Sequence, residues 1–369
     1  MTALLIQHSP DFCDCDLQTV SDVVMRTLHE ICVDPAVFNT DEVVFARHPT
    51  LFDCISVPVP QCAASILAEM EKNLRAAIGR CCTVYAVPRL FSTSFRLRDV
   101  GIHVIAKQDT DAWQGLVDEG FMFNGWRPED PRPGLRKDRT FSPNGNFESV
   151  LVADSHGTKK GTRFSSVLKF RALLAVTLAV VTERREHPYF KSAADPLGFC
   201  AQFPHESNPD KTLNRSDCGP LIPYYVDDIP VGAVEITAIR DWYAKCAQCG
   251  PDTKNRIEKA AHFLNLGMNA DGSEAYVNYF VTLDALFGQR GSVEASILAG
   301  LNTLGLDARQ IEKARWLFEL RSEIVHGGSR YIEEWPKYAK YSRHFRTKPM
   351  RDVQTLAHLS ILRAPQVLA

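Results

Sequence analysis

One amphipathic segment, residues 313–328, ends in a cluster of side chains that could perform chemistry; it reads KARWLFELRSEIVHGG. Arg321 is permanently cationic, and its guanidinium can bind two phosphate oxygens at once. His326 changes charge near neutral pH, so it can give or take a proton. These two residue types suit cleavage of RNA by its own 2′-hydroxyl, because one side chain would move a proton while the other stabilises negative charge on phosphorus. This chemistry requires no metal ion, and we expect no cofactor.

The apolar spacing of this segment predicts a helix with one buried face. Asp307 is expected to cap its start, and the pair Gly327-Gly328 to end it. Residues five apart on an ideal helix point about 140° apart, from roughly 100° per residue. Arg321 and His326 therefore share one face only if the helix loosens at Gly327. Alternatively, each could meet a second copy of the motif across a dimer.

The residues from Arg321 to His326 resemble the R-x4-6-H motif of HEPN ribonucleases, and the longer string RSEIVHGG is similar to the Apea-like HEPN branch. The upstream string FVTLDALFG, residues 280–288, fits that branch too, although the family usually has Glu where this chain has Asp284. The resemblance covers residues 254–365 approximately. It implies a helical bundle that forms a homodimer, with two motifs building one composite site. It also implies metal-independent RNA cleavage, as a toxin or an anti-phage defence effector.

Under this hypothesis Arg321 binds the scissile phosphate and His326 acts as the acid or base. Ser322 and Asp284 would orient them or the substrate. One alternative is a catalytically inactive HEPN module that binds RNA or a protein and dimerises. Another is a solvated helix end with no chemistry, with Asp284 on the solvent edge of its own helix.

Residues 329–351 follow the motif directly and hold seven basic against two acidic residues, interleaved with aromatic rings. Cations hold phosphates, and aromatic rings stack on unpaired bases. This segment could deliver RNA, with tRNA as one candidate, to the motif. The candidate RNA contacts are Arg330, Lys337, Tyr338, Lys340, Tyr341, Arg343 and Arg346. The alternative is an amphipathic segment whose aromatic rings pack on the bundle.

Composition narrows the class of protein. The net charge of −2 excludes a global basic field, so any nucleic-acid binding depends on a local patch. The 11 cysteines are odd in number and irregular in spacing, which favours reduced thiols in a cytoplasmic protein. Cys246 and Cys249 form a lone CxxC; zinc sites use about four ligands, so incidental thiols are expected and a zinc-dependent regulator is the weaker alternative.

The expected fold class is α+β, with a mixed α/β N-terminal region (1–232) followed by an all-α HEPN-like helical bundle (233–369). The Pro- and Gly-rich residues 124–146 are a candidate subdivision of the first region. Its expected role, sensing a phage or cellular trigger or restraining the nuclease, rests on the resemblance alone. The apolar run 172–181 is shorter than the roughly 20 residues of a membrane span, so we expect a buried helix and no membrane. Residues 154–162 resemble a phosphate loop faintly but lack its spacing.

Periodicity predicts the individual elements. The expected helices of the first region are 17–33, 65–78, 109–119 and 165–185. Its expected strands are 42–46, 55–59, 82–87, 101–106 and 149–153, and residues 186–232 are expected to be irregular. The expected helices of the bundle are 234–247, 255–266, 275–287, 293–304, 307–325 and 353–363.

Overall fold

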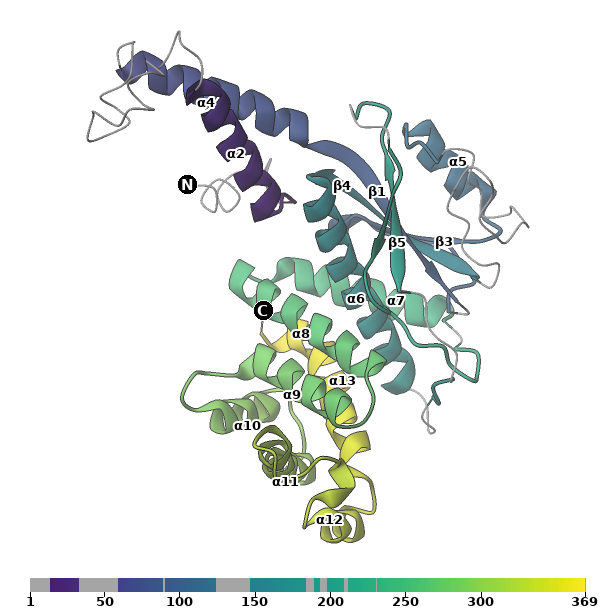
Figure 1. Cartoon of the computed structure of the whole chain (residues 1–369). Coiled ribbons are helices and arrows are strands. Elements are labelled where there is room, and N and C mark those ends of the chain that lie inside the picture. Colours follow the sequence, from purple (N-terminus) through teal and green to yellow (C-terminus); the bar gives the residue numbers. More distant parts are fainter. Residues whose placement is uncertain are drawn as a thin grey trace.

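The structure is a computed structural model, and it describes residues 14–32, 59–88, 90–123, 147–183, 189–192, 198–208, 212–229 and 231–368. Within these ranges the chain forms an antiparallel six-stranded sheet beside a helical bundle (Figure 1). The α+β class is therefore confirmed. The strands, in sheet order, are β2 (Phe95–Leu97), β3 (Ile102–Ala106), β4 (Ser149–Gly157), β1 (Gly79–Val87), β5 (Phe199–Pro204) and β6 (Asn214–Asp217).

Both faces of the sheet are covered, and strand alternation decides which residue faces which side. On β1, Tyr85 and Val87 belong to the large core that continues into the bundle, whereas Val84 and Ala86 belong to a second core. The helix α5 (Thr110–Asp118) closes this second core with Trp113 and Leu116. A strand buried on both faces has a continuous run of apolar residues, and this run is why the sequence predicted β1.

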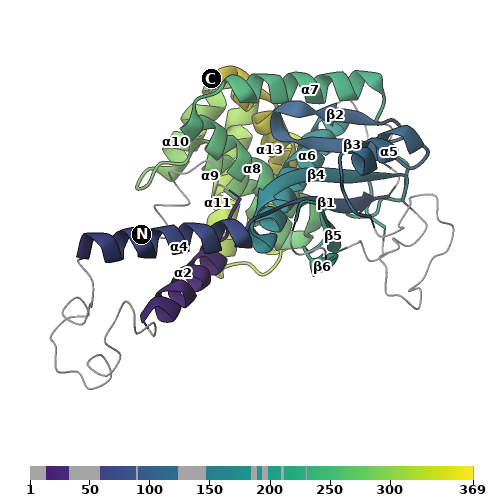
Figure 2. The same ribbon diagram turned by 90° about the horizontal axis from the view of Figure 1, so that it is seen from above.

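The helix α6 (Lys159–Glu183) follows β4 and lies between the sheet and the bundle (Figure 2). Residues 170–181 are buried without interruption, because the sheet packs on one side of the helix and α8 and α13 pack on the other. This confirms the predicted buried helix. Among the described residues, α6 alone is long and apolar enough to cross a membrane, and 72% of its most apolar window is already buried inside the molecule.

The second part of the chain is all helical. Its helices are α7 (Ala233–Gln248), α8 (Pro251–Asn269), α9 (Gly272–Phe287), α10 (Val293–Thr303), α11 (Ala308–Val325), α12 (Tyr338–Phe345) and α13 (Pro349–Val367). One apolar core runs from the sheet through α6 into these helices. The division of the chain at residue 233 stays a prediction, as does a HEPN arrangement of the helices.

Two N-terminal helices, α2 (Leu17–Cys32) and α4 (Val59–Ala77), form a hairpin that projects beyond the sheet (Figure 1). They share a small core that includes Val20, Val24, Met70 and Leu74. The segment before α2 packs so closely on the start of α6 that a Cβ on Gly161 would lie 2.1 Å from the carbonyl oxygen of Asp14.

The structure corrects some predicted elements. Residues 186–232 are not irregular throughout, because β5 and β6 pair there and β5 joins β1. Their strand signal is weak because both strands are short and lie among Pro-rich connections. The helix α12 and the strand β2 were not predicted. The predicted strand 42–46, residues 55–58 of the next strand and the linker 124–146 lie outside the described residues, and Val59 begins α4.

Candidate functional site

The helix α11 begins and ends at the residues expected from sequence. The side chain of Asp307 accepts a hydrogen bond from the backbone N–H of Gln310 at 2.8 Å, which caps the start. At the other end, Gly327 takes a left-handed φ of 76°, and the N–H of Gly328 donates to the carbonyl of Glu323 at 2.7 Å. Together with the bond from Gly327 N–H to Ile324, this is a Schellman cap, which fixes the end of the helix firmly.

The motif side chains lie on this rigid end. His326 occupies the C-cap and is exposed, as is Ser322, whereas Arg321 is half-buried. Within the described ranges, none of these three side chains makes a hydrogen bond or an ion pair with another residue. The helix does not loosen before His326, so Arg321 and His326 leave it in directions about 140° apart. In one copy of the chain the two side chains therefore point in different directions and do not face a common site.

Asp284 lies in the last turn of α9 and is exposed. Its carboxylate folds over Gly288, at the C-cap of the same helix, where a Cβ would lie 1.7 Å from Oδ1. In the described structure no hydrogen bond or ion pair joins Asp284 to Arg321 or His326. The geometry of a single copy thus matches the alternative of a carboxylate at the solvent edge of its helix.

The aromatic rings of residues 329–351 mostly build core. Tyr341 is fully buried, and its hydroxyl donates to Asp352 Oδ2 at 2.7 Å. Trp335 and Phe345 are also buried, and both rings contact Trp316 of α11. These three rings fasten α12 and the preceding turn to the bundle, so they are not free to stack on bases.

The cations of this segment are divided between protein partners and solvent. Arg330 pairs with Glu334 at 2.8 Å, and Lys337 pairs with Glu319 at 2.7 Å. Lys340 lies over the Trp316 ring, 5.4 Å from its centroid. Of the remaining candidates, Tyr338 is half-buried, while Arg343 and Arg346 are exposed.

The CxxC thiols are structural. Cys246 and Cys249 are buried at the end of α7, and Cys249 Sγ approaches the carbonyl of Lys245 at 3.5 Å. Burial raises the pKa of Cys246 to about 11, so its thiol stays protonated at neutral pH. A search of the described residues finds no group of three His, Cys, Asp or Glu side chains placed to hold a metal ion.

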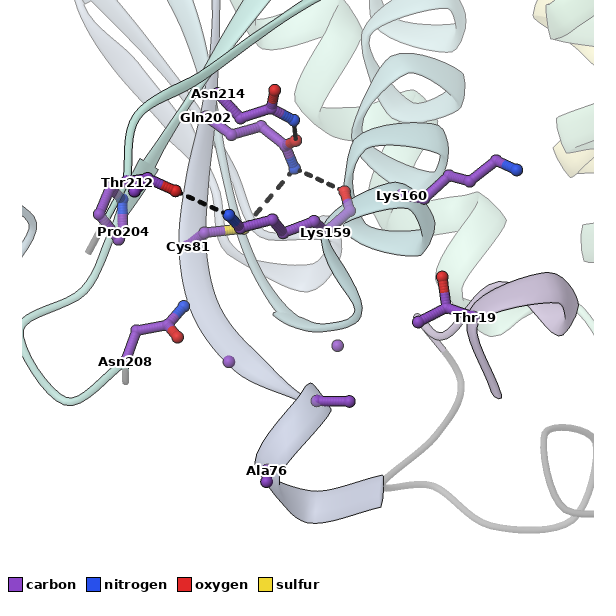
Figure 3. Close-up of a pocket in the computed structure, with 13 residues that line it drawn as sticks. Thr19, Ala76, Cys81, Lys159, Lys160, Gln202, Pro204, Asn208, Thr212 and Asn214 are labelled. Carbon is purple, nitrogen blue, oxygen red and sulfur yellow. Dashed lines mark hydrogen bonds between the residues drawn. The ribbon is translucent and has the colours of Figure 1, made fainter. Parts of the chain in front are cut away.

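A second polar cluster, which the sequence did not identify as a site, surrounds the first turn of α6 (Figure 3). It borders a cavity of about 370 Å³ between β1, β5 and α6. The Gln202 amide donates to the carbonyl of Lys159 and to Thr162 Oγ1, both at 3.0 Å, and accepts from Asn214 at 3.0 Å. Lys159 Nζ in turn donates to Thr212 at 2.8 Å.

The start of α6 is capped by protein side chains. Thr158 Oγ1 accepts from the N–H of Gly161 at 3.2 Å and donates to Asp16 Oδ2 at 2.8 Å. Hydrogen bonds from Thr19 and Thr158 contribute to a lowered pKa of the Asp16 carboxyl, against the opposing effect of its burial. The faint phosphate-loop pattern of residues 154–162 is thus a strand, a capped turn and a helix start. The signal that could have identified it is Thr158 itself, because Thr is a preferred residue directly before the first turn of a helix.

Comparison of the chain with models of known protein families, with curated proteins and with solved structures finds no match.

Proposed function

We propose that this protein is a metal-independent endoribonuclease of the HEPN type, with Arg321 and His326 as its catalytic pair. The observation that carries the proposal is the end of α11. There a rigid cap presents an arginine, a serine and a histidine that make no side-chain bond to the rest of the described protein. Polar groups held in place without a protein partner are available to a substrate.

In the proposed reaction the 2′-hydroxyl attacks the adjacent phosphorus, and the 5′-oxygen of the next nucleotide leaves. Arg321 binds the non-bridging phosphate oxygens and stabilises the charge that builds on them. His326 moves a proton at the attacking or the leaving oxygen. The products are a 2′,3′-cyclic phosphate and a 5′-hydroxyl end.

The directions of the two side chains favour a homodimer. A site that uses Arg321 of one copy and His326 of the second copy removes the 140° difference within one helix. Ser322 then lies beside the substrate. Asp284 remains a proposed positioning residue only through the dimer, since it makes no bond to either catalytic side chain within one copy.

The test is incubation of the purified protein with total RNA and with tRNA in excess EDTA. Wild type should yield 2′,3′-cyclic phosphate ends, and His326→Ala should yield at least about 100-fold fewer, the usual size of a lost acid or base. His156→Ala, which removes another exposed histidine, is the matched control and should cleave normally. Equal cleavage by wild type and His326→Ala would refute the assignment.

Mixing two inactive variants tests the shared site. If Arg321 and His326 act across two copies, Arg321→Ala mixed with His326→Ala rebuilds one intact site in each mixed dimer. Random mixing should then restore about a quarter of the activity, since about half of the dimers are mixed and each keeps one of the two Arg321–His326 pairs of a wild-type dimer. A site contained within one copy would gain nothing from mixing.

A non-catalytic RNA- or protein-binding module is the second candidate. It is favoured by the separation of Arg321 from His326 and by the absence of a bonded partner for either of them within the described single copy. Such a module should bind RNA equally well with His326→Ala, and should lose affinity when the exposed Lys340 and Arg343 are replaced. Lys337 is the weaker test of the three basic residues because Glu319 already neutralises it.

A further inference from the structure

Two cysteines lie side by side at one edge of the sheet. Cys200 is the second residue of β5, and Cys218 directly follows β6, which is the last strand of the sheet (Figure 2). Cys200 is aligned with Ser216, and the N–H of Cys218 donates to the carbonyl of Gly198 at 2.8 Å, so the pairing continues to Cys218. The two cysteines are therefore diagonal neighbours across an antiparallel pair of strands.

Both thiols point to the face of the sheet that carries α6. Side chains alternate along a strand, so Cys200 points the same way as Gln202, whose amide bonds α6. On β6 the side chain of Asn214 bonds Gln202, and alternation continues this face through Ser216 to Cys218. Cys218 also packs against the core that contains α6. The two side chains are in contact, because the Cys218 thiol hydrogen-bonds the sulfur of Cys200.

The surroundings favour one thiolate in this pair. The hydrogen bond from Cys218 lowers the pKa of Cys200 against the opposing effect of burial, and the charge of Arg163 lowers it further. The same hydrogen bond raises the pKa of Cys218, because the pair retains one shared proton. Arg171 of α6 lies beside Cys218, and its Nη2 donates to the Cys218 carbonyl at 3.1 Å. The thiolate is the reactive form in thiol–disulfide exchange, so hydrogen bonding and nearby cations both assist that reaction.

The two thiols differ in exposure. Cys200 is completely buried, whereas Cys218 is half-buried. A small molecule from solution therefore reaches Cys218 first, and Cys200 then reaches only its neighbour. The thiols of the CxxC sequence, Cys246 and Cys249, are both buried, and burial raises the pKa of Cys246 to about 11. Exposure and charge thus favour exchange at the pair on the strands over exchange at the CxxC.

We propose that Cys200 and Cys218 form a reversible disulfide by exchange with a small-molecule disulfide such as oxidised glutathione. Transfer of the shared proton to Cys200 leaves Cys218 as a thiolate, which attacks one sulfur of oxidised glutathione and releases the first glutathione thiolate. Cys200 then loses its proton and attacks Cys218 Sγ, which forms the internal disulfide and releases the second glutathione. The two cysteines lose two electrons and two protons, and the glutathione disulfide takes both. The proposal is independent of the nuclease, because it concerns other residues.

The position of the pair explains how the bond closes and what it holds. Diagonal neighbours lie slightly farther apart than the roughly 3.5–4.5 Å between the Cβ atoms of a disulfide, so one strand must shift a little. The strand β6 has a partner on one side only, and the chain turns directly after Cys218 at Gly219, which has a left-handed φ of 64°. The bond would join the two ends of the segment that supplies Gln202 and Asn214 to the cavity of Figure 3. Oxidation would therefore fix this wall of the cavity.

The experiment is treatment of the reduced full-length protein with excess oxidised glutathione, followed by blocking of free thiols, tryptic digestion without reductant and mass spectrometry. Trypsin cleaves after Arg215, which separates the two cysteines, so only a disulfide keeps their peptides together. We expect this cross-linked pair of peptides, and we expect dithiothreitol to release it. Amides of β6 should exchange with deuterium at least about 10-fold more slowly in the oxidised protein. Cys249→Ala is the matched control, because it removes a buried thiol elsewhere and should leave the cross-link unchanged.

Two single variants test the order of the two steps. Cys200→Ala should accumulate glutathione on Cys218, because no second thiol remains to displace it. Cys218→Ala should accumulate none on Cys200, because that thiol is completely buried. Three results in folded wild-type protein would each overturn the proposal: glutathione that stays on Cys218 without a cross-link, a cross-link that joins Cys246 to Cys249 instead, or no oxidation of Cys200 and Cys218.

Discussion

The start of α6 and the end of α11 are both helix ends dense with polar residues, yet the protein uses them in opposite ways. At the start of α6, Thr158, Thr162 and Gln202 are buried and bond to one another or to the neighbouring backbone. At the end of α11, the backbone is capped but the side chains of Arg321 and His326 bond to nothing else in the described chain. The first end holds the sheet, α6 and the N-terminal hairpin together; the second leaves its polar groups available.

This difference separates polar groups that stabilise the fold from polar groups that are available for a function. Buried polar groups contribute when all their partners are present, and they cost free energy when one partner is removed. Exposed groups with no partner contribute almost nothing to folding, so their presence at a rigid helix end requires another reason. The following changes test this separation, in order of decreasing expected effect on stability.

The largest effect concerns a buried histidine, His358 of α13, which contrasts with the exposed His326. Its Nε2 has no partner among the described residues, and burial lowers its pKa to about 4. Between pH 6.5 and pH 4 the unfolded chain binds a proton there that the folded chain does not, so stability falls as the pH falls. Urea unfolding should lose roughly 3 kcal/mol across this window from His358 alone. His358→Leu should flatten this slope. An unaltered slope in His358→Leu would show that His358 is not its source.

The second change inserts one methyl group at the start of α6. In Gly161→Ala the new Cβ would lie 2.1 Å from the Asp14 carbonyl oxygen, so the segment before α2 must move. We expect a net loss of about 1–2 kcal/mol and faster hydrogen exchange in α2. Gly115→Ala in α5 is the control, since its nearest neighbour would be 3.9 Å away, and it should gain roughly 0.5–1 kcal/mol. Unchanged exchange in α2 would show that this segment does not depend on Gly161.

The third change removes the amide that bridges β5 and α6. Gln202→Leu keeps the side-chain volume but loses the hydrogen bonds to Thr162 and Lys159. It also removes the oxygen that accepts the hydrogen bond of the Asn214 amide. The expected cost is about 1–2 kcal/mol in the free energy of unfolding, measured by denaturant titration. Gln114→Leu, on the exposed face of α5, should stay within about 0.5 kcal/mol of wild type. If Gln202→Leu left the free energy of unfolding unchanged, this network would contribute no net stability.

The smallest effects are expected at the end of α11. Arg321→Ala, Ser322→Ala and His326→Ala should each change the free energy of unfolding by less than about 0.5 kcal/mol. Gly327→Ala is the positive control. It should lower the free energy of unfolding by about 1 kcal/mol, because a left-handed φ of 76° disfavours alanine, and this loss would show that the assay detects destabilisation at this helix end. A large loss of stability in His326→Ala would mean that this histidine supports the fold, which would remove the reason to assign it a function.

The candidate site was predictable where its features are local. The helix α11 starts after Asp307 and ends at Gly327 and Gly328, as these residue types predict, because capping involves only atoms a few residues apart. Asp284 was less predictable, since its direction depends on how the last turn of α9 ends at Gly288. The basic and aromatic segment 329–351 illustrates the same limit: its composition fits RNA contact, but the packing of Tyr341 and Trp335 follows from where α12 lies against α11.

The sequence by itself determined the helices of the bundle other than α12, the buried character of α6 and the two doubly buried strands β1 and β4. It could do so because apolar periodicity and caps are properties of neighbouring residues. Only the tertiary structure decided that β5 and β6 extend the sheet, that α6 joins the sheet to the bundle, and that Lys159, Gln202 and Asn214 border one cavity. These features join residues far apart in the chain, and no local pattern records which distant surfaces meet.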